Sequence, residues 1–283
     1  MSKTKIIDNI LDGLTYLGLI LITVSVFMPL IWIILSSMQV GNSLYSSTFL
    51  PKSLTLDHYK ALFSQTDFPI WYMNTLKIAT LNMIFGVIIT TLTAYTFSRY
   101  KFRGRKQAMI GMLVLQMFPS FLAMTAIYIL ITKMGLMDTH AGLLIVYVAG
   151  QIPYNSWLVK GYFDGIPKSL DEAARVDGAG HLTIFLKIIM PITKPIVVFV
   201  ALTNFIGPWF DFIFPKLLLR SAEKKTLAVG IFEWISSRAN DNFTQFAAAS
   251  ILIAVPIAVL FMYLQKHIVA GLSAGATKEF FIV

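Results

Sequence analysis

The chain has 283 residues, of which 57% are hydrophobic and only 13% are charged, and its formal net charge is +9. Soluble domains carry about 25% charged residues, so this composition indicates one membrane domain rather than two soluble ones. The absence of cysteine excludes disulfides, thiolate zinc sites and iron–sulfur clusters. In a membrane protein the positive charge bears on topology, and no nucleic-acid partner is expected.

Six apolar segments reach the length of about 20 residues that a membrane-spanning helix requires. They cover residues 14–35, 74–98, 107–132, 141–163, 192–215 and 246–267. The first follows two lysines but lacks a small-residue cleavage site, which predicts a retained anchor rather than a signal peptide. The pattern predicts an all-α, polytopic fold in a single transmembrane domain over residues 1–283.

The loop after the second segment reads RYKFRGRK and is strongly basic. Short basic loops stay in the cytoplasm, so this loop predicts that both chain termini are cytoplasmic. Residues 36–73 and 216–245 then form external loops, and residues 164–191 form a cytoplasmic loop. The segment 216–245 also carries basic residues, but the rule is weak for longer loops.

Residues 169–180 read SLDEAARVDGAG, a charged and alanine-rich stretch inside the predicted cytoplasmic loop. Ser169 and Glu172 have the spacing of a capping box, and Gly178 is a typical residue to end a helix. The pattern therefore predicts a helix of about two turns that starts near Leu170. A helix this short is unstable alone in water, so it needs a surface on which to dock.

One face of this short helix combines small, acidic and apolar residues at helical spacing. Its members are Leu170, Ala173, Ala174 and Asp177. The helix can lie on the membrane surface or dock a cytoplasmic protein. Membrane-surface helices are rich in lysine and large apolar residues, so the alanines and acids favour a protein partner. The apolar positions of the next segment, residues 182–191, are expected to pack against the bundle.

The run EAARVDGAG, followed by IIMP, resembles the EAA loop of ABC importer permeases. The segments TLAVGI, FAAAS and GLSAGATK are similar to the maltose/maltodextrin branch of the carbohydrate family, in its smaller permease subunits. The resemblance implies a type I importer fold with six spans and a cytoplasmic coupling helix, in a bacterial cytoplasmic membrane. It also implies maltose or maltodextrin as substrate and a second, larger permease, two ATPase subunits and an external sugar-binding protein as partners.

The resemblance further implies a role for the EAA loop, where the ATPase subunits dock. Glu172 is expected to make a polar contact to the ATPase, while Ala173, Ala174 and Gly178 form a close-packed surface. The predicted ATPase-coupling residues are Ser169, Leu170, Glu172, Ala173, Ala174, Asp177 and Gly178. Glu172 has an alternative interpretation as a capping residue alone.

The sequence contains no recognisable catalytic site. It lacks the G-x-x-x-x-G-K-[ST] phosphate loop, and its four histidines have no metal-ligand spacing. The chain is therefore expected to be a transport subunit rather than an enzyme, without a metal or cofactor, while partner ATPases bind ATP and magnesium. Alternatives are an importer for another oligosaccharide or a glycerol derivative, or a secondary transporter. The last is disfavoured because no internal repeat is visible.

Polar and aromatic residues within the predicted spans are candidates for a sugar pathway. They are Gln151, Tyr154, Asn155, Asn204, Trp209 and Asp211. Hydrogen bonding between helices is the alternative for the amides, and an interfacial aromatic belt is the alternative for the tryptophan. In the external loop, Glu233, Trp234 and Arg238 are candidates for contact with a binding protein, although a simple solvated loop is equally consistent with their composition.

Overall fold

A computed structural model describes residues 3–41, 51, 53–117, 120–236 and 243–279 of the chain. Within these ranges every regular element is a helix, which confirms the predicted all-α class. The longer helices are α1 (Lys3–Ser37), α3 (Phe68–Arg99), α4 (Arg105–Met117), α5 (Met124–Lys133), α6 (His140–Asp164), α10 (Lys194–Phe210), α12 (Leu227–Ser236) and α13 (Phe243–Glu279). The shorter ones are α2 (Asp57–Ser64), η1 (Ser120–Ala123), α7 (Ser169–Val176), α8 (His181–Ile184), η2 (Phe185–Ile189), α9 (Met190–Ile192), α11 (Ile213–Leu218) and η3 (Ala222–Lys224).

The chain divides into two units, one with residues 1–66 and 233–254 and the other with residues 67–232 and 255–283. In the first unit, hydrogen bonds among the described residues join the end of α1 to the start of α2. The hydroxyls of Ser37 and Tyr59 lie 2.7 Å apart, and the His58 ring bonds the Gln39 carbonyl at 2.8 Å. These bonds fix the turn that follows the first apolar helix.

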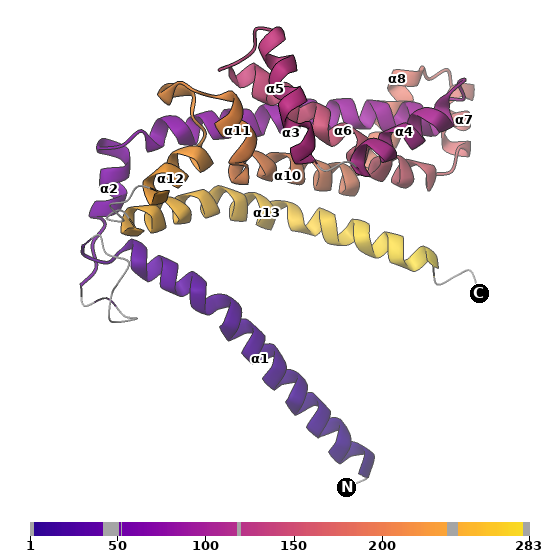
Figure 1. The fold of residues 1–283 in the computed structure, drawn as a ribbon. Coiled ribbons are helices and arrows are strands. Elements are labelled where there is room, and N and C mark those ends of the chain that lie inside the picture. The colour runs from indigo at the N-terminus through magenta and orange to yellow at the C-terminus, as the bar shows by residue number, and fades with distance from the viewer. Residues whose placement is uncertain (1–2, 42–50, 52, 118–119, 237–242, 280–283) are drawn as a thin grey trace. The chain divides into compact units, whose positions relative to one another are not determined.

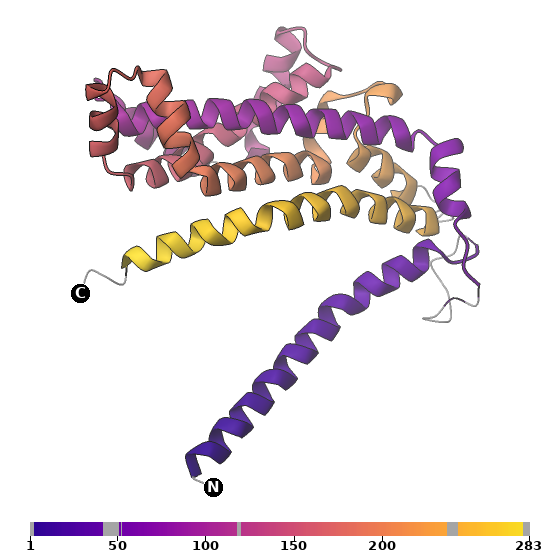
Figure 2. The ribbon, with the colours of Figure 1, turned by 180° about the vertical axis from the view of Figure 1, so that it is seen from behind.

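The second unit is built on α3, α6 and α10, which run side by side (Figures 1 and 2). Two apolar clusters hold these helices together, one near each end. The cluster near α7 and α8 includes Ala94, Val159, Phe163, Ala174, Ile184, Phe185, Ile189 and Val200. The cluster near α5 and α11 includes Ile78, Ile131, Leu143, Leu218 and Leu219. The segment after α7 thus packs against the bundle, as its apolar pattern predicts.

Three helical stretches in the described part of the chain are long and apolar enough to cross a membrane. They are Leu11–Ser37, Phe68–Arg99 and Phe243–Lys266, and up to five spans result if each of two bent helix pairs is one span. α6 falls outside this set, although its 25 residues extend for about 37 Å. The count of six spans therefore stays a prediction.

The predicted fifth span, 192–215, has different bounds in the structure. α10 begins at Lys194, where the chain bends by 83° relative to the preceding helical segment, His181–Ile192. It ends at Phe210, because the Asp211 carboxylate accepts a hydrogen bond from the Ile213 N–H at 2.8 Å and a new helix begins there. An acidic residue that bonds the backbone two positions ahead favours a turn over helix continuation. The predicted third span, 107–132, is likewise divided between α4 and the pair η1 and α5.

Candidate functional site

The helix α7 lies where the EAA motif predicts it, but its first turn differs from the prediction. The helix starts at Ser169, and Lys168 occupies the N-cap position without a side-chain cap. Within this described segment, the predicted reciprocal bonds of Ser169 and Glu172 are not formed. The Glu172 N–H instead donates to the Lys168 carbonyl at 3.1 Å. Because Ser169 is already helical, its hydroxyl is not in the position of a capping group.

The end of α7 matches the prediction. Gly178 has a φ of +81°, a conformation that L residues with a side chain rarely adopt. Its N–H donates to the Arg175 carbonyl at 3.0 Å, and the Ala179 N–H donates to the Ala174 carbonyl at 2.9 Å. These two bonds are the Schellman pattern that terminates a helix. The glycine therefore fixes α7 at eight residues.

The predicted docking face of α7 is divided between the protein interior and its surface. Ala174 is buried in the cluster beside α8, so it is not available to a partner. Leu170, Ala173 and Asp177 are exposed and share one side of the helix, and Glu172 is exposed beside them. Ser169 and Gly178 are exposed at the two ends of this segment. Val176, which the sequence analysis did not select, is the most exposed large apolar residue near this face, at 89%.

A buried ion pair attaches α7 to the rest of the molecule. The Arg99 Nε lies 2.6 Å from a carboxylate oxygen of Asp171, and the two side chains are only 3% and 7% exposed. Arg99 also donates to the carbonyl of Phe163 at 3.1 Å and to that of Ile166 at 3.2 Å. One guanidinium at the end of α3 thus holds both α7 and the carbonyl end of α6, where a cation is electrostatically favoured.

Sequence reasoning missed this pair. Arg99 is one of several basic residues in a loop that indicates topology, and Asp171 precedes the recognisable motif by one position. A second link lies alongside, where the Ser98 hydroxyl donates to the Asp164 carboxylate at 2.7 Å and Lys160 forms an ion pair with the same carboxylate. A charged residue at the end of an apolar helix was the one signal for these contacts, and it did not identify the partners.

Three of the residues proposed to line a sugar pathway meet in one amide cluster between α3, α6 and α10. Gln151 donates to the side-chain oxygen of Asn82 at 2.9 Å, and Asn82 donates to the Asn204 carbonyl at 2.7 Å. Asn155 donates to the side-chain oxygen of Asn204 at 3.0 Å. In this structure the amides therefore join helices, which is the alternative interpretation of these residues. Asn82 is the link that the sequence analysis did not select.

Gly86 makes room for this cluster. A Cβ at that position would lie 2.5 Å from the amide nitrogens of both Asn204 and Gln151. The Asn204 nitrogen has no hydrogen-bond acceptor among the described residues, although the side chain is buried. A buried amide donor without an acceptor costs free energy.

The other three pathway candidates make no hydrogen bond with the side chains of this amide cluster in the described structure. Tyr154 is 59% exposed, whereas Trp209 is 2% exposed and meets Tyr72 edge-on at 5.3 Å between ring centres. Asp211 accepts a hydrogen bond from the Tyr147 hydroxyl at 2.8 Å. The six candidates thus do not form one lining in this structure, and their contact with a sugar stays a prediction.

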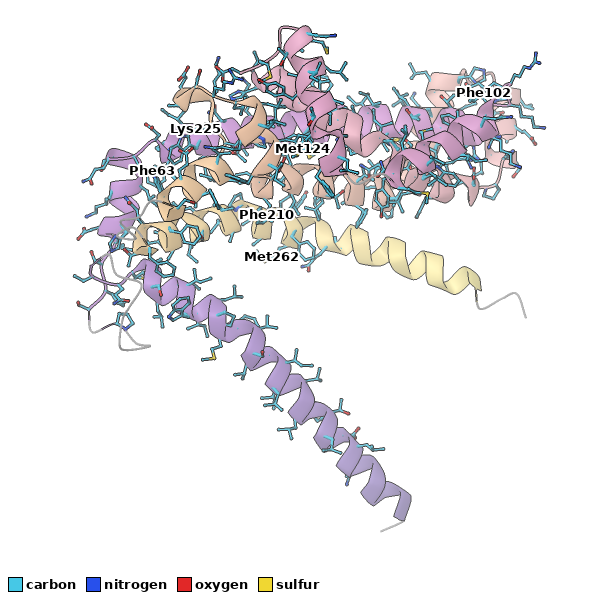
Figure 3. The ribbon with its side chains drawn as sticks, viewed as in Figure 1. Phe63, Phe102, Met124, Phe210, Lys225 and Met262 are labelled. Carbon is cyan, nitrogen blue, oxygen red and sulfur yellow. The ribbon has the colours of Figure 1, made fainter. Side chains whose placement is uncertain are left out.

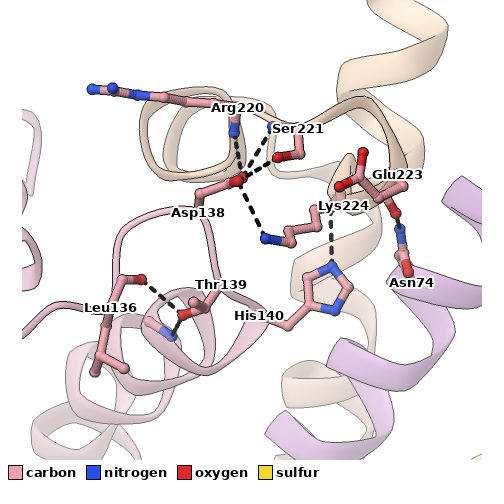
Figure 4. Close-up of polar contacts among 10 residues, drawn as sticks. Asn74, Leu136, Asp138, Thr139, His140, Arg220, Ser221, Glu223 and Lys224 are labelled. Carbon is pink, nitrogen blue, oxygen red and sulfur yellow. Dashed lines mark hydrogen bonds and ion pairs between the residues drawn. The ribbon is translucent and has the colours of Figure 1, made fainter.

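At the end of the bundle opposite α7, the turn between α5 and α6 is tied to the segment that follows α11 (Figure 4). Asp138 accepts hydrogen bonds from the Arg220 and Ser221 N–H groups at 2.8 and 3.0 Å, from the Ser221 hydroxyl, and from Lys224 at 3.2 Å. The Ser221 hydroxyl, together with these N–H groups, lowers the pKa of Asp138 well below its usual value. The His140 ring and the Lys224 carbonyl, 3.0 Å apart, extend the contact.

The residues proposed to contact a binding protein follow this segment. Glu233 and Trp234 are half-buried at the end of α12, and Arg238 lies outside the described residues. Their role stays a prediction. Among the residues that the structure describes, no group of three or more His, Cys, Asp or Glu side chains has a metal-binding arrangement.

Comparison with known proteins agrees with the motif and the fold. The maltodextrin transport system permease protein MdxG of Bacillus subtilis is 46% identical over 93% of this chain and 95% of its own length. The galactooligosaccharides transport system permease protein GanQ, also of Bacillus subtilis, is 42% identical over 93% of this chain and 94% of its own.

Among solved structures, a bacterial ABC transporter involved in the import of the acidic polysaccharide alginate superposes with a TM-score of 0.81. The alignment covers 94% of this chain and 98% of that one at 24% identity, which supports the fold. The family model described as binding-protein-dependent transport system inner membrane component matches residues 83–274. The chain therefore belongs to the family of inner membrane components of binding-protein-dependent transport systems.

Proposed function

We propose that the chain is a permease subunit of an ABC importer that moves maltodextrin-type oligosaccharides into the cell. The observation that carries the proposal is the exposed face of α7, which a buried ion pair holds rigidly at one end of the bundle. The substrate class is supported by the relatives, one of which is named as a maltodextrin permease. A second substrate class, galactooligosaccharides, is supported by the name of another relative at nearly equal identity.

The proposed topology has both chain termini in the cytoplasm. The contacts within the second unit are consistent with the pairing of loops that this topology requires, because the end of α3 and the segment with α7 meet at one end through Arg99 and Asp171. The turn after α5 and the segment after α11 meet at the other end through Asp138 and Ser221. The proposed topology requires that each of these two pairs lies on one side of the membrane.

In the proposed mechanism, two ATPase subunits dock on α7 of this chain and on the equivalent helix of a second, larger permease. ATP and magnesium are bound by the ATPases, and a sugar-binding protein delivers substrate on the external side. When the ATPases close, they push on Leu170, Ala173 and the neighbouring exposed side chains. The push reaches α3 and α6 directly, because Arg99 in α3 forms an ion pair with α7 and donates hydrogen bonds to the carbonyls of Phe163 and Ile166 at the end of α6.

The proposal is tested by replacing a small residue on the α7 face in the assembled importer. The Ala173→Arg variant is expected to abolish both co-purification of the ATPase and ATP-dependent uptake of labelled maltotriose in proteoliposomes. Ala222→Arg is the matched control, because Ala222 is also exposed but lies in η3 at the other end of the bundle. Normal ATPase binding by the Ala173→Arg variant would disprove the docking face.

The substrate assignment has its own measurement. The importer with the unmodified chain is supplied with labelled maltotriose or a labelled galactooligosaccharide, together with the binding protein encoded beside it. Uptake of maltotriose is expected to dominate. Preferential uptake of the galactooligosaccharide would keep the importer function and replace the substrate class.

A further inference from the structure

The basic loop after α3, which predicts the membrane topology, also lines a cavity of about 590 Å³. This volume falls in the range of small-molecule sites, which is about 300–1,000 Å³. Four cationic side chains from three segments line it: Lys101, Arg105, Lys106 and Lys160. Figure 3 shows Phe102, which also lines the cavity, at the end of the bundle that carries α7 and α8.

The walls of the cavity are fixed by the backbone and by a hydrogen bond between α6 and α4. Gly104 has a φ of +86°, which turns the loop back into the first turn of α4. The Trp157 indole N–H donates to the Met109 carbonyl at 3.0 Å and thereby joins α6 to α4 beneath the cations. Lys160 is held in place by its ion pair with Asp164. The position of Lys160 is therefore fixed, while Lys101, Arg105 and Lys106 supply the charge that no ion pair among the described residues offsets.

The charge of the cavity selects an anion, and its apolar part selects an amphiphile. Lys101 and Lys106 are exposed, and Arg105 is half-buried beside them. Phe102 and Trp157 contribute apolar surface to the same cavity. Farther along α4, a row of large apolar side chains is exposed, with Ile110 at 48%, Leu113 at 42% and Val114 at 46%. A free phosphate or a nucleotide would pair with the cations but leave this apolar surface uncovered.

We propose that this cavity binds the headgroup of an anionic phospholipid, with its acyl chains along the apolar side of α4. Basic pockets beside membrane helices are suited to anionic headgroups, and each basic residue near such a surface contributes about 1 kcal/mol. The placement of the bound phospholipid in the inner leaflet rests on the proposed cytoplasmic position of this loop. Binding of the headgroup itself is independent of which sugar the importer carries.

The test measures lipid binding to the assembled, delipidated importer by native mass spectrometry. The probes are phosphatidylglycerol, phosphatidylcholine and inorganic phosphate. The unmodified complex is expected to retain phosphatidylglycerol in preference to phosphatidylcholine. The Lys101→Gln/Lys106→Gln variant is expected to bind phosphatidylglycerol about 30-fold more weakly, as two lost contributions of about 1 kcal/mol imply.

The matched control is Lys187→Gln/Lys194→Gln. It removes two exposed lysines from the segments just before and at the start of α10, which lie outside the cavity lining. This control is expected to leave phosphatidylglycerol binding unchanged. Equal loss in the control, equal binding of phosphatidylcholine, or displacement of the lipid by inorganic phosphate at matched concentration would each overturn the assignment. A thermal shift on adding phosphatidylglycerol, lost only in the cavity variant, gives an independent readout.

Discussion

The buried pair of Arg99 and Asp171 makes the most direct prediction about how α7 is held. In the Arg99→Met variant, the Asp171 carboxyl group loses its cationic partner in a site where its side chain is 7% exposed. The carbonyls of Phe163 and Ile166 lose donors at 3.1 and 3.2 Å. Removing one partner of a buried pair costs about 3–5 kcal/mol. An eight-residue helix cannot compensate for this loss, since it is unstable without its contacts.

Hydrogen exchange across residues 169–179 of the full importer measures this effect. A loss of 3 kcal/mol in local stability speeds exchange by about 100-fold, since 1.4 kcal/mol corresponds to a factor of ten. Exchange in α5, at the opposite end of the unit, is the internal control. The Arg99→Met/Asp171→Ala double variant is expected to lose less than the sum of the two single variants, because no unpaired charge remains. Unchanged exchange in Arg99→Met, or a strictly additive double variant, would refute the reasoning.

Three further predictions concern single positions. Gly86→Ala is expected to destabilise the chain by about 1–3 kcal/mol, because the Cβ of the alanine would lie 2.5 Å from the Asn204 amide nitrogen. The measurement is a lower Tm, and an unchanged Tm would show that the amide cluster moves freely. Gly178→Ala is expected to lower the stability of α7 by about 1 kcal/mol and to speed its hydrogen exchange, because the φ of Gly178 is +81°. Gly180→Ala is the control, and equal exchange in the two variants would contradict the need for a left-handed residue at position 178. Asp138 has a lowered pKa in the folded chain, so its contribution to stability is present above its ordinary pKa of 3.8 and is lost as pH falls below that value. The Asp138→Asn variant is expected to lack this stability already at pH 7, and its Tm is expected to change less with pH on the acid side. A Tm profile identical to that of the unmodified chain would contradict this.

In the proposed mechanism, one continuous helix would carry a push on α7 to distant parts of the bundle. α3 joins the Arg99 pair at one end to the amide cluster near its middle, through one continuous helix. The amide cluster includes a donor on Asn204 that has no acceptor among the described residues.

Much of this protein could be predicted from local pattern alone. The apolar runs predict helices because a segment of about 20 apolar residues in a membrane satisfies its own backbone hydrogen bonds as a helix. Gly178 predicts the end of α7, since a left-handed residue is needed there and glycine adopts that conformation without strain. The exposed positions Leu170, Ala173 and Asp177 follow from helical spacing. The EAA motif predicts the family, which the relatives confirm.

Only the tertiary structure decided which partners the polar residues take. Asp171 is buried rather than exposed because Arg99, far away in the chain, reaches it, and the same contact turns Ala174 inward. Gln151 bonds Asn82 and Asn155 bonds Asn204, and these bonds join α3, α6 and α10, as composition alone could not indicate. Periodicity reports which face of one helix is apolar. A polar side chain takes its partner from another helix, and that choice depends on how the helices pack, which no local sequence pattern encodes.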